Sequence, residues 1–290
     1  MFLETLAATI GHARMRHLGR VICCYANADG LGDDHALNGE GYLMEALAAG
    51  GKGSLGGHGG VLHVLEVGAN QGQQAQALAE SCVSRGLAGQ VVIHSFEPSQ
   101  FNFSRLAGVA GGTSGIEIRP VQMAVGREPG MAALTCFDAA GGGTNSLVMR
   151  QASANEGAGE SHQEMVRVTT LDGYSAEQGI SRVYWMRTDT EGNELNVLRG
   201  AEGLLREGRI DYIEFEYNSC WIDSRCFLAD AFSLLAGYGY AVGKLRKDGV
   251  EEFAKYDYRL EWFEHGNYVA WRRTLTPPFR VIRTESYLAL

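Results

Sequence analysis

Acidic side chains recur in this sequence where an apolar run gives way to a turn. The run "VLHVLEVGANQG" reaches Glu66 and then the glycines Gly68 and Gly72, and "VVIHSFEP" ends at Glu97. Both runs have the length and composition of buried strands, and each is followed by a helical pattern. Ligands of open parallel sheets bind beyond the carboxyl ends of the strands, so these carboxylates are expected to face one ligand.

The glycine turn does not suit a phosphate. A dinucleotide fingerprint needs G-x-G-x-x-G, but Asn70 replaces the middle glycine, and the sequence contains no Gly-Lys-Ser/Thr of a P-loop. Glu66 would repel a phosphate and attract an ammonium group, whereas Glu97 can accept hydrogen bonds from both hydroxyls of a ribose. An amino group and a nucleoside without phosphates describe S-adenosylmethionine. The alternative for Glu97 is a helix-terminal acid, with Pro98 in the first turn.

The predicted cofactor site draws on four segments that each follow a strand. It comprises Glu66, Gly68, Ala69, Asn70 and Gly72, then Glu97 and Pro98, then Gln122, Met123 and Ala124 bordering the adenine, and finally Asp189. A further loop, "GGGTNSL", could fold over the cofactor with Thr144, Asn145 and Ser146 as hydrogen-bond donors. A plain hairpin loop would have the same composition.

Methyl transfer from a sulfonium is an in-line displacement that depends mainly on alignment in a dry pocket, and a hydroxyl acceptor also benefits from a base or a metal. The candidate catalytic residues are Asp189, Glu216 and His265. Asp189, Glu216 and Asn218 end two adjacent strands and offer oxygen ligands for Mg²⁺. Asp189 and Glu191 could instead cap the helix that begins in "GNELNVL".

Several motifs occur in the order typical of FkbM-type methyltransferases. They are "LEVGANQG", "SFEPSQFNFSRL", "VRVTTLDGY", "RTDTEGNELNVLRGAEGLL" and "NYVAWR", between residues 61 and about 273. The sequence therefore resembles that family, which implies a seven-stranded class I methyltransferase fold and methyl transfer, most often to a hydroxyl oxygen. Glu66 replaces the family's usual Asp and Arg187 its common Lys. Both replacements keep the charge.

The chain divides into three predicted segments. Residues 1–60 form an N-terminal helical extension that ends in a glycine-rich joint at 48–60, residues 61–275 form the cofactor-binding domain, and 276–290 form a C-terminal tail. From residue 61 onward, strands alternate with helices, which predicts an α/β, Rossmann-like fold: a mostly parallel sheet with helices on both faces. We expect the extension to cap the substrate pocket or to form a homodimer contact, so deleting residues 1–47 should spare cofactor binding and abolish turnover.

The composition restricts the kinds of molecule that the protein is expected to bind. The 290 residues carry 25 basic and 34 acidic side chains, a formal net charge of -9, which disfavours nucleic acid and anionic lipid. The six cysteines show no Cys-x-x-Cys spacing and are expected to be reduced thiols. The sequence also shows no signal-like N-terminus and no apolar run of membrane length. Together these features predict a cytoplasmic protein. The expected partner is a small-molecule acceptor.

The leading hypothesis is an S-adenosylmethionine-dependent enzyme that methylates a hydroxyl oxygen of a small molecule or sugar. One alternative is an NAD(P)-dependent Rossmann oxidoreductase, which Asn70 disfavours. Another is a non-catalytic nucleoside-binding module, which the intact Glu66, Gly68, Gly72 and Glu97 disfavour. Calorimetry with S-adenosylmethionine and NAD distinguishes all three.

Overall fold

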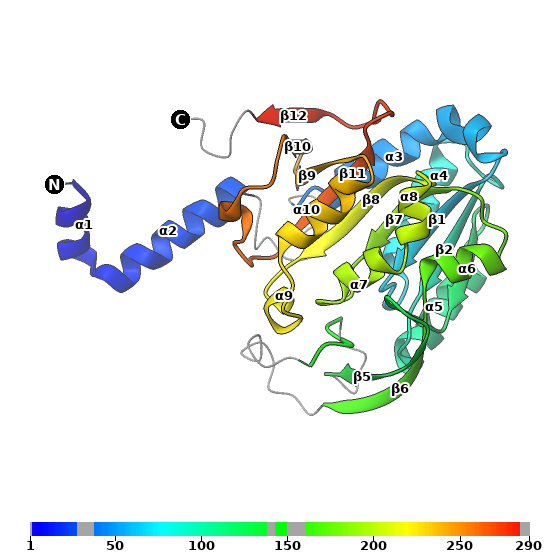
Figure 1. Cartoon of the computed structure of the whole chain (residues 1–290), viewed down its shortest axis with the longest axis horizontal. Coiled ribbons are helices and arrows are strands. Elements are labelled where there is room, and N and C mark those ends of the chain that lie inside the picture. Colours follow the sequence, from blue (N-terminus) through cyan, green and yellow to red (C-terminus); the bar gives the residue numbers. More distant parts are fainter. Residues whose placement is uncertain (1, 28–37, 138–142, 150–160, 285–290) are drawn as a thin grey trace.

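The computed structural model describes residues 2–27, 38–137, 143–149 and 161–284. A nine-stranded sheet passes through the body in the order β12-β10-β9-β11-β8-β7-β1-β2-β3 (Figure 1). Its strands are β1 (Leu62–Val67), β2 (Val91–Phe96), β3 (Glu117–Val121), β7 (Val183–Thr188), β8 (Ile210–Tyr217), β9 (Tyr240–Arg246), β10 (Gly249–Phe253), β11 (Gly266–Arg272) and β12 (Val281–Thr284).

Strand direction identifies the fold. Strands β3, β2, β1, β7 and β8 are parallel to one another, and β11 is antiparallel to both β8 and β9. An inserted antiparallel strand beside five parallel ones is the arrangement of class I methyltransferases, so the predicted fold class is confirmed. Two strands, β10 and β12, extend the sheet beyond the predicted seven. The tail was expected to lie beyond the last strand, but β12 pairs parallel with β10 after Pro277 and Pro278.

Alternating side chains bury both faces of the sheet, as a period of two requires. In β1, Leu62 and Val64 belong to one apolar core, and Leu65 and Val67 belong to the other. The first core is covered by α3 (Glu40–Ser54), α4 (Gln73–Ser84) and α5 (Gln100–Gly112). The second is covered by α6 (Leu171–Glu177), α7 (Glu194–Arg199), α8 (Glu202–Arg206), α9 (Cys220–Asp223) and α10 (Leu228–Gly237).

A small second sheet lies across the carboxyl ends of the parallel strands (Figure 1). It has the order β4-β6-β5, with β4 (Ala124–Val125), β5 (Gly130–Cys136) and β6 (His162–Thr169). Strands β5 and β6 form an antiparallel hairpin. The apolar run "IEIRPVQMAV" has the pattern of one strand but is divided, because β3 joins the large sheet and β4 the small one.

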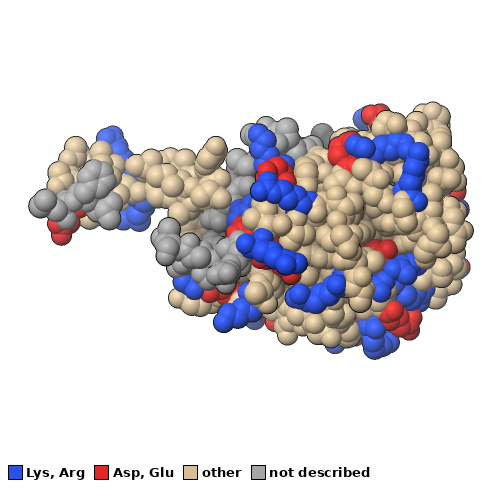
Figure 2. Space-filling view, turned by 90° about the horizontal axis from the view of Figure 1, so that it is seen from above, with Lys and Arg blue, Asp and Glu red and all other residues tan. Residues whose placement is uncertain are grey.

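The N-terminal helices α1 (Phe2–Ile10) and α2 (His12–Asn27) extend away from the body as an arm (Figures 1 and 2). They meet at Gly11, whose φ of +82° ends the first helix. Arg20 joins the arm to the body through an ion pair with Glu264 at 2.7 Å. On the face shown in Figure 2, Lys and Arg side chains are dispersed rather than gathered in one stripe. None of the described helices is long and apolar enough to cross a bilayer.

The predicted glycine-rich joint is instead a close-packed helix. Helix α3 continues to Ser54 and is followed by the 3-10 turn η1 (Leu55–His58). A Cβ on Gly50 would lie 2.7 Å from a Pro278 carbon, and one on Gly51 would lie 2.9 Å from a Leu87 methyl. These glycines allow α3 to approach the body closely, so glycine here reflects packing and not a flexible linker.

The helix expected over "GNELNVLRGAEGLLREG" is also interrupted, between α7 and α8. A Cβ on Gly200 would lie 2.1 Å from the Gly126 carbonyl oxygen, so this turn packs directly on the backbone before β5. Helix α6 was not anticipated, and neither was the turn η2 (Tyr258–Leu260) before β11. The carboxyl ends of β1, β2, β7 and β8 remain together, and they position the site.

Candidate functional site

The glycine turn after β1 closes against the tip of β7. Gly68 has φ of +86°, and a Cβ there would lie 1.8 Å from the Asp189 carbonyl oxygen. The backbone N–H groups of Gly68 and Ala69 both donate to the Phe96 carbonyl at the end of β2. Only glycine combines this conformation with this approach. The turn therefore fixes the three strand ends relative to one another.

Glu97 lies at the centre of this arrangement. Its carboxylate accepts the N–H of Asn70 at 3.0 Å and the N–H of Ser99 at 2.9 Å. The residue is 5% exposed, and burial raises the pKa of its carboxyl to about 7, although both N–H donors oppose the shift. The carboxylate thus bridges the glycine turn and the start of α5, where it lines a pocket.

The pocket has polar groups at one end and apolar walls elsewhere. Its lining includes Gly68, Asn70, Glu97, Pro98, Asn102, Met123, Asp189 and Glu191, with apolar walls from Val67, Phe96, Ala124, Val125, Leu134 and Leu147. The side-chain oxygens of Asn70 and Asn102 are buried, and neither has a hydrogen-bond partner among the described residues. Buried side-chain oxygens usually have a donor, so these two are candidates for contact with a ligand.

Part of the pocket wall comes from the β5–β6 hairpin. Leu134 belongs to β5, and Leu147 belongs to the segment 143–149, which also contributes Gly143 and Asn145. Ser146 pairs with Thr135 and donates through its hydroxyl to the Glu191 carbonyl at 2.8 Å. The loop predicted to fold over the cofactor does approach the pocket, but Ser146 holds the backbone of the loop after β7. Thr144 is not among the lining residues.

Carboxylates gather at the ends of β7 and β8, where Asp189 and Glu191 line the pocket and Glu216 lies outside its lining. Asp189, Glu191 and Glu216 each offer an oxygen, and these oxygens lie within 4.8 Å of one another. Burial raises the pKa of Glu216 well above its usual value, and the charges of Asp189 and Glu191 add to the shift. His265 lies beside them, with Nε2 2.7 Å from Oε1 of Glu216. The three predicted catalytic residues Asp189, Glu216 and His265 are therefore neighbours.

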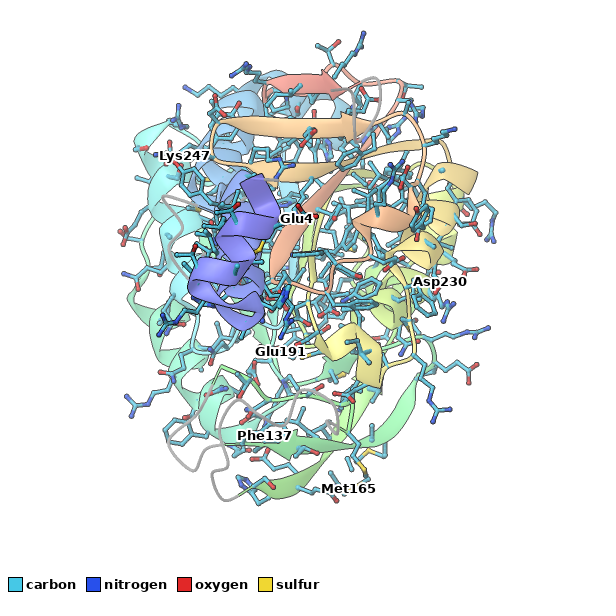
Figure 3. The ribbon with its side chains drawn as sticks, turned by 90° about the vertical axis from the view of Figure 1, so that its left-hand side faces the viewer. Glu4, Phe137, Met165, Glu191, Asp230 and Lys247 are labelled. Atoms are coloured by element: carbon cyan, nitrogen blue, oxygen red, sulfur yellow. The ribbon has the colours of Figure 1, made fainter. Side chains whose placement is uncertain are left out.

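Figure 3 shows Glu191 between the large sheet and the hairpin that carries Phe137 and Met165. Glu191 has φ of +56°, which is uncommon for a residue with a side chain. The N-cap residue of the next helix, α7, is Asn193, and the carboxylate of Glu194 accepts the N–H groups of Thr190 and Gly192 in the loop before that helix. Glu191 is thus not the helix cap. Its carboxylate instead faces Asn218 and the thiol of Cys220, each at 3.3 Å.

Asn218 does not fit the predicted role of a magnesium ligand. Its side-chain oxygen accepts the N–H of Cys220 at 2.8 Å, and its amide nitrogen donates to Glu216 at 2.7 Å. Asn218 therefore turns a donor toward the carboxylates, whereas Mg²⁺ requires oxygen ligands in near-octahedral geometry. Asn218 and His265 already supply hydrogen-bond donors to Glu216.

A buried ion-pair network lies behind the pocket. The Arg187 guanidinium contacts Glu40 and Asp189, both at 3.2 Å, and approaches Glu214 at 3.9 Å. Burial opposes its charge, but these carboxylates together with Glu66 outweigh burial and raise the pKa of Arg187. Glu40 belongs to α3, so the N-terminal extension contributes directly to the support of Asp189.

Glu66 belongs to this support and not to the pocket lining. It is 3% exposed and accepts the Ser95 hydroxyl at 2.6 Å, and burial raises the pKa of its carboxyl. Ala69, Gly72 and Gln122 of the predicted cofactor set also lie outside the lining, whereas Gly68, Asn70, Glu97, Pro98, Met123, Ala124 and Asp189 are within it. Gln122 is exposed and bonds Gln100. Direct contact of Glu66 with a ligand stays a prediction.

Sequence reasoning missed three contributors: Asn102, Glu40 and the apolar wall of the hairpin. Asn102 lies on α5 and lines the pocket. The helical pattern of the sequence indicates only that this position lies between the exposed and the buried face of the helix. Its short distance from Glu97 along the chain was the one available signal, because the first turn of a helix after a strand faces the ligand edge of the sheet.

Comparison with known proteins gives one family match. The family model described as "Methyltransferase FkbM domain" matches residues 66–242, more than half of the chain. No curated protein matches. The similar solved structures include the methyltransferase FkbM from Methylobacillus flagellatus KT, with 14% identity, a TM-score of 0.42 and coverage of 73% of this chain. This chain spans 43% of the length of that protein.

Two further structures are similar at the same level. The magnesium protoporphyrin IX methyltransferase from Synechocystis PCC 6803, solved with bound SAM, has 10% identity and a TM-score of 0.37, with 81% of this chain and 80% of that chain covered. Fibrillarin from Aeropyrum pernix, with natively bound S-adenosyl-L-methionine, has 12% identity and a TM-score of 0.37, with coverage of 78% and 76%.

Proposed function

The chain belongs to the FkbM family of methyltransferases, and we propose that it transfers a methyl group from S-adenosylmethionine to a hydroxyl oxygen of a small molecule or sugar. The observation that carries this proposal is the pocket at the strand ends. It combines the buried carboxylate of Glu97 with the buried oxygens of Asn70 and Asn102, which have no hydrogen-bond partner among the described residues. A nucleoside supplies hydroxyl and amino donors for all three acceptors.

The pocket residues fit the cofactor by their chemistry. Glu97 accepts the ribose hydroxyls, Asn70 and Asn102 accept further donors, and Met123 and Leu134 pack against the adenine. Among the described residues, those that line the pocket include no Lys or Arg, which suits a nucleoside without phosphates. Asp189, whose side chain is one-third exposed, faces the ammonium group, while Glu66 holds the strand ends from behind. The bound cofactor supplies an already activated methyl group.

Residues on the acceptor side serve to orient the hydroxyl and to remove its proton. His265 and Glu216 form a pair that can receive this proton, and Asp189 orients the acceptor. We derive no step through Mg²⁺, because Asn218 presents an amide nitrogen to the carboxylates. Catalysis in this arrangement depends on alignment and on a base in a dry site.

The charge of the acceptor side favours a neutral substrate. Asp189, Glu191 and Glu216 converge there, and the neighbouring cation Arg187 is buried behind them. A phosphate or carboxylate acceptor would be repelled by these side chains, and a long nucleic acid even more so. A polyol or sugar hydroxyl can donate to the same carboxylates. We therefore expect an acceptor that carries hydroxyl donors and no negative charge.

Calorimetry tests the proposal directly. We expect S-adenosylmethionine to bind the intact protein and NAD⁺ not to bind. Glu97→Gln should weaken cofactor binding by roughly 10- to 100-fold, since a hydrogen bond to a charged acceptor contributes about 1.5–3 kcal/mol. The matched control is Glu80→Gln, which changes an exposed carboxylate on α4 and should bind normally.

Two outcomes would contradict the proposal: tight binding of NAD⁺ in place of S-adenosylmethionine, or unchanged cofactor affinity in Glu97→Gln. Transfer of a labelled methyl group to a panel of neutral polyols and anionic acceptors then tests the acceptor class. Preference for the anionic compounds would refute the charge argument.

A further inference from the structure

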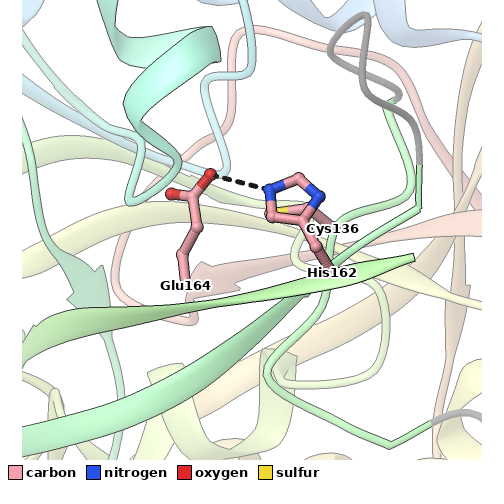
Figure 4. A group of neighbouring side chains, drawn as sticks. All are labelled: Cys136, His162 and Glu164. Carbon is pink, nitrogen blue, oxygen red and sulfur yellow. Dashed lines mark hydrogen bonds and ion pairs between the residues drawn. The ribbon is translucent and has the colours of Figure 1, made fainter. Parts of the chain in front are cut away.

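A second cluster of chemically active side chains lies on the β5–β6 hairpin, apart from the acceptor side. Cys136 on β5 and His162 on β6 are direct cross-strand partners, and Glu164 is two residues along β6 on the same face (Figure 4). Ligand atoms of all three lie within 4.8 Å of one another. His162 Nε2 and Glu164 Oε1 are 3.3 Å apart.

We propose that Cys136, His162 and Glu164 form a zinc-binding site that fastens the hairpin over the cofactor pocket. A thiolate, an imidazole and a carboxylate are the donors that Zn²⁺ takes in proteins, and a fourth position can remain for water. Zn²⁺ holds such atoms at about 2.0–2.3 Å, so tetrahedral neighbours lie about 3.3–3.8 Å apart. The separation between His162 and Glu164 already matches that spacing.

The surroundings hold the ligands in place. Glu164 uses its other oxygen to accept the N–H of Gln100 at 3.0 Å, which orients the carboxylate from outside the cluster. Cys136 is 2% exposed and has no disulfide partner. Among the described residues, the ion-pair partner of Glu164 is His162 and not a Lys or Arg, and an imidazole can serve a metal ion as a neutral ligand. Binding releases the thiol proton to solvent.

The location gives the site its role, which rests on the proposed function of the pocket. Cys136 follows Thr135, whose backbone pairs with Ser146, and Leu134 of the same strand lines the pocket. On the other side, Gln100 begins α5 directly after the residues that hold Glu97. An ion at the cluster would therefore join β5 to β6 and hold Glu164 where it contacts Gln100 at the start of α5.

Cobalt substitution tests the site independently of catalysis, because a thiolate bound to Co²⁺ gives a charge-transfer band in the near ultraviolet. The background protein carries Cys23→Ser and Cys24→Ser, which removes the two cysteines of the arm, one exposed and one partly exposed. We expect one equivalent of Co²⁺ to produce the band, and Zn²⁺ to displace it. Cys136→Ser should abolish the band, and His162→Ala should weaken metal binding by more than about 100-fold.

Matched controls are Cys226→Ser and His17→Ala, which should leave the band unchanged. His162→Ala decides the matter if Cys136→Ser does not fold, because the His162 side chain is 54% exposed. No band in the background protein, or an equal band and affinity in His162→Ala, would overturn the proposal. Cofactor affinity with and without metal is measured separately, so a failed methyltransferase assignment leaves the metal result readable.

Discussion

Replacing Glu40 tests whether the N-terminal extension is part of the catalytic unit. Glu40 is buried on α3, where it accepts hydrogen bonds from Arg187 at 3.2 Å, Asn267 at 2.7 Å and Gln74 at 3.2 Å. Glu40→Gln keeps the size of the side chain and removes its charge. We expect a large loss of stability together with reduced turnover, because Arg187 also positions Asp189.

The magnitude follows from the geometry. At 3.2 Å and an effective dielectric constant of about 20, the attraction between Glu40 and Arg187 is about 5 kcal/mol. Removing the charge also removes the several kcal/mol that its burial costs. Asp189 and Glu214 continue to compensate Arg187, so the free energy of unfolding should fall by about 2–3 kcal/mol, below the 3–5 kcal/mol typical of an orphaned buried charge.

Urea unfolding monitored by tryptophan fluorescence measures this loss. The control is Glu45→Gln on the same helix, whose half-exposed carboxylate pairs with Arg85 and should contribute less than about 1 kcal/mol. Equal denaturation midpoints for the two variants would refute the reasoning. That result would mean that α3 packs on the domain without stabilising it, in line with the expectation that a 1–47 deletion spares cofactor binding.

Three further predictions concern the pocket. Gly68→Ala should abolish cofactor binding and lower the melting temperature, because the added Cβ would lie 1.8 Å from the Asp189 carbonyl oxygen. The control Gly56→Ala should do neither, because a Cβ at Gly56 would have no atom within 4 Å. Cofactor affinity should fall by up to about tenfold per pH unit below pH 7, because burial raises the pKa of Glu97 to about 7 and protonation removes the hydrogen-bond acceptor. Calorimetry at several pH values measures this profile, and Glu97→Gln should flatten it. His265→Gln should lower kcat by roughly 100-fold in a methyl-transfer assay without changing cofactor affinity, and an equal loss of affinity would assign it to binding instead.

The same Glu97 shift has an opposite consequence for folding. A carboxyl whose pKa is raised above its ordinary value of 4.5 favours the folded state while it is protonated. Its contribution to stability is therefore complete below pH 4.5 and is lost as the pH rises through about 7. As the pH rises through about 7, cofactor affinity should therefore increase while the contribution of Glu97 to folding stability decreases. This opposition is expected of a residue that serves ligand binding and not stability.

The sheet and the pocket's central acid were predictable because their signals are local. An apolar run followed by an acid and a turn predicts a strand end, and Glu97, Gly68 and Asp189 all lie where that pattern places them. The hydrophobic period also gives the order of strands and helices. What fixes Glu97 in the pocket is backbone geometry that follows directly from the strand–turn–helix sequence.

The remaining features depend on contacts between distant segments. Glu40 meets Arg187 across 147 residues of chain, and no periodicity near either residue indicates that pair. The stretch around Gly50 and Gly51 has a composition typical of a linker, and only the proximity of Leu87 and Pro278 explains it as packing. The direction of a side chain also depends on distant contacts. Asn218 ends a strand as expected, but its side-chain oxygen accepts a hydrogen bond from the backbone N–H of Cys220.

The proposed methylation of a hydroxyl releases a proton that must leave the site. Asp189, Glu191 and Glu216 make proton uptake favourable there, since burial and mutual repulsion raise the pKa of Glu216. A proton held only by a buried carboxylate would stop the next cycle. His265 bonds that carboxylate at 2.7 Å and is 30% exposed, so it alone of the pair reaches solvent. In the proposed reaction the proton can therefore arrive at Glu216 and leave through His265.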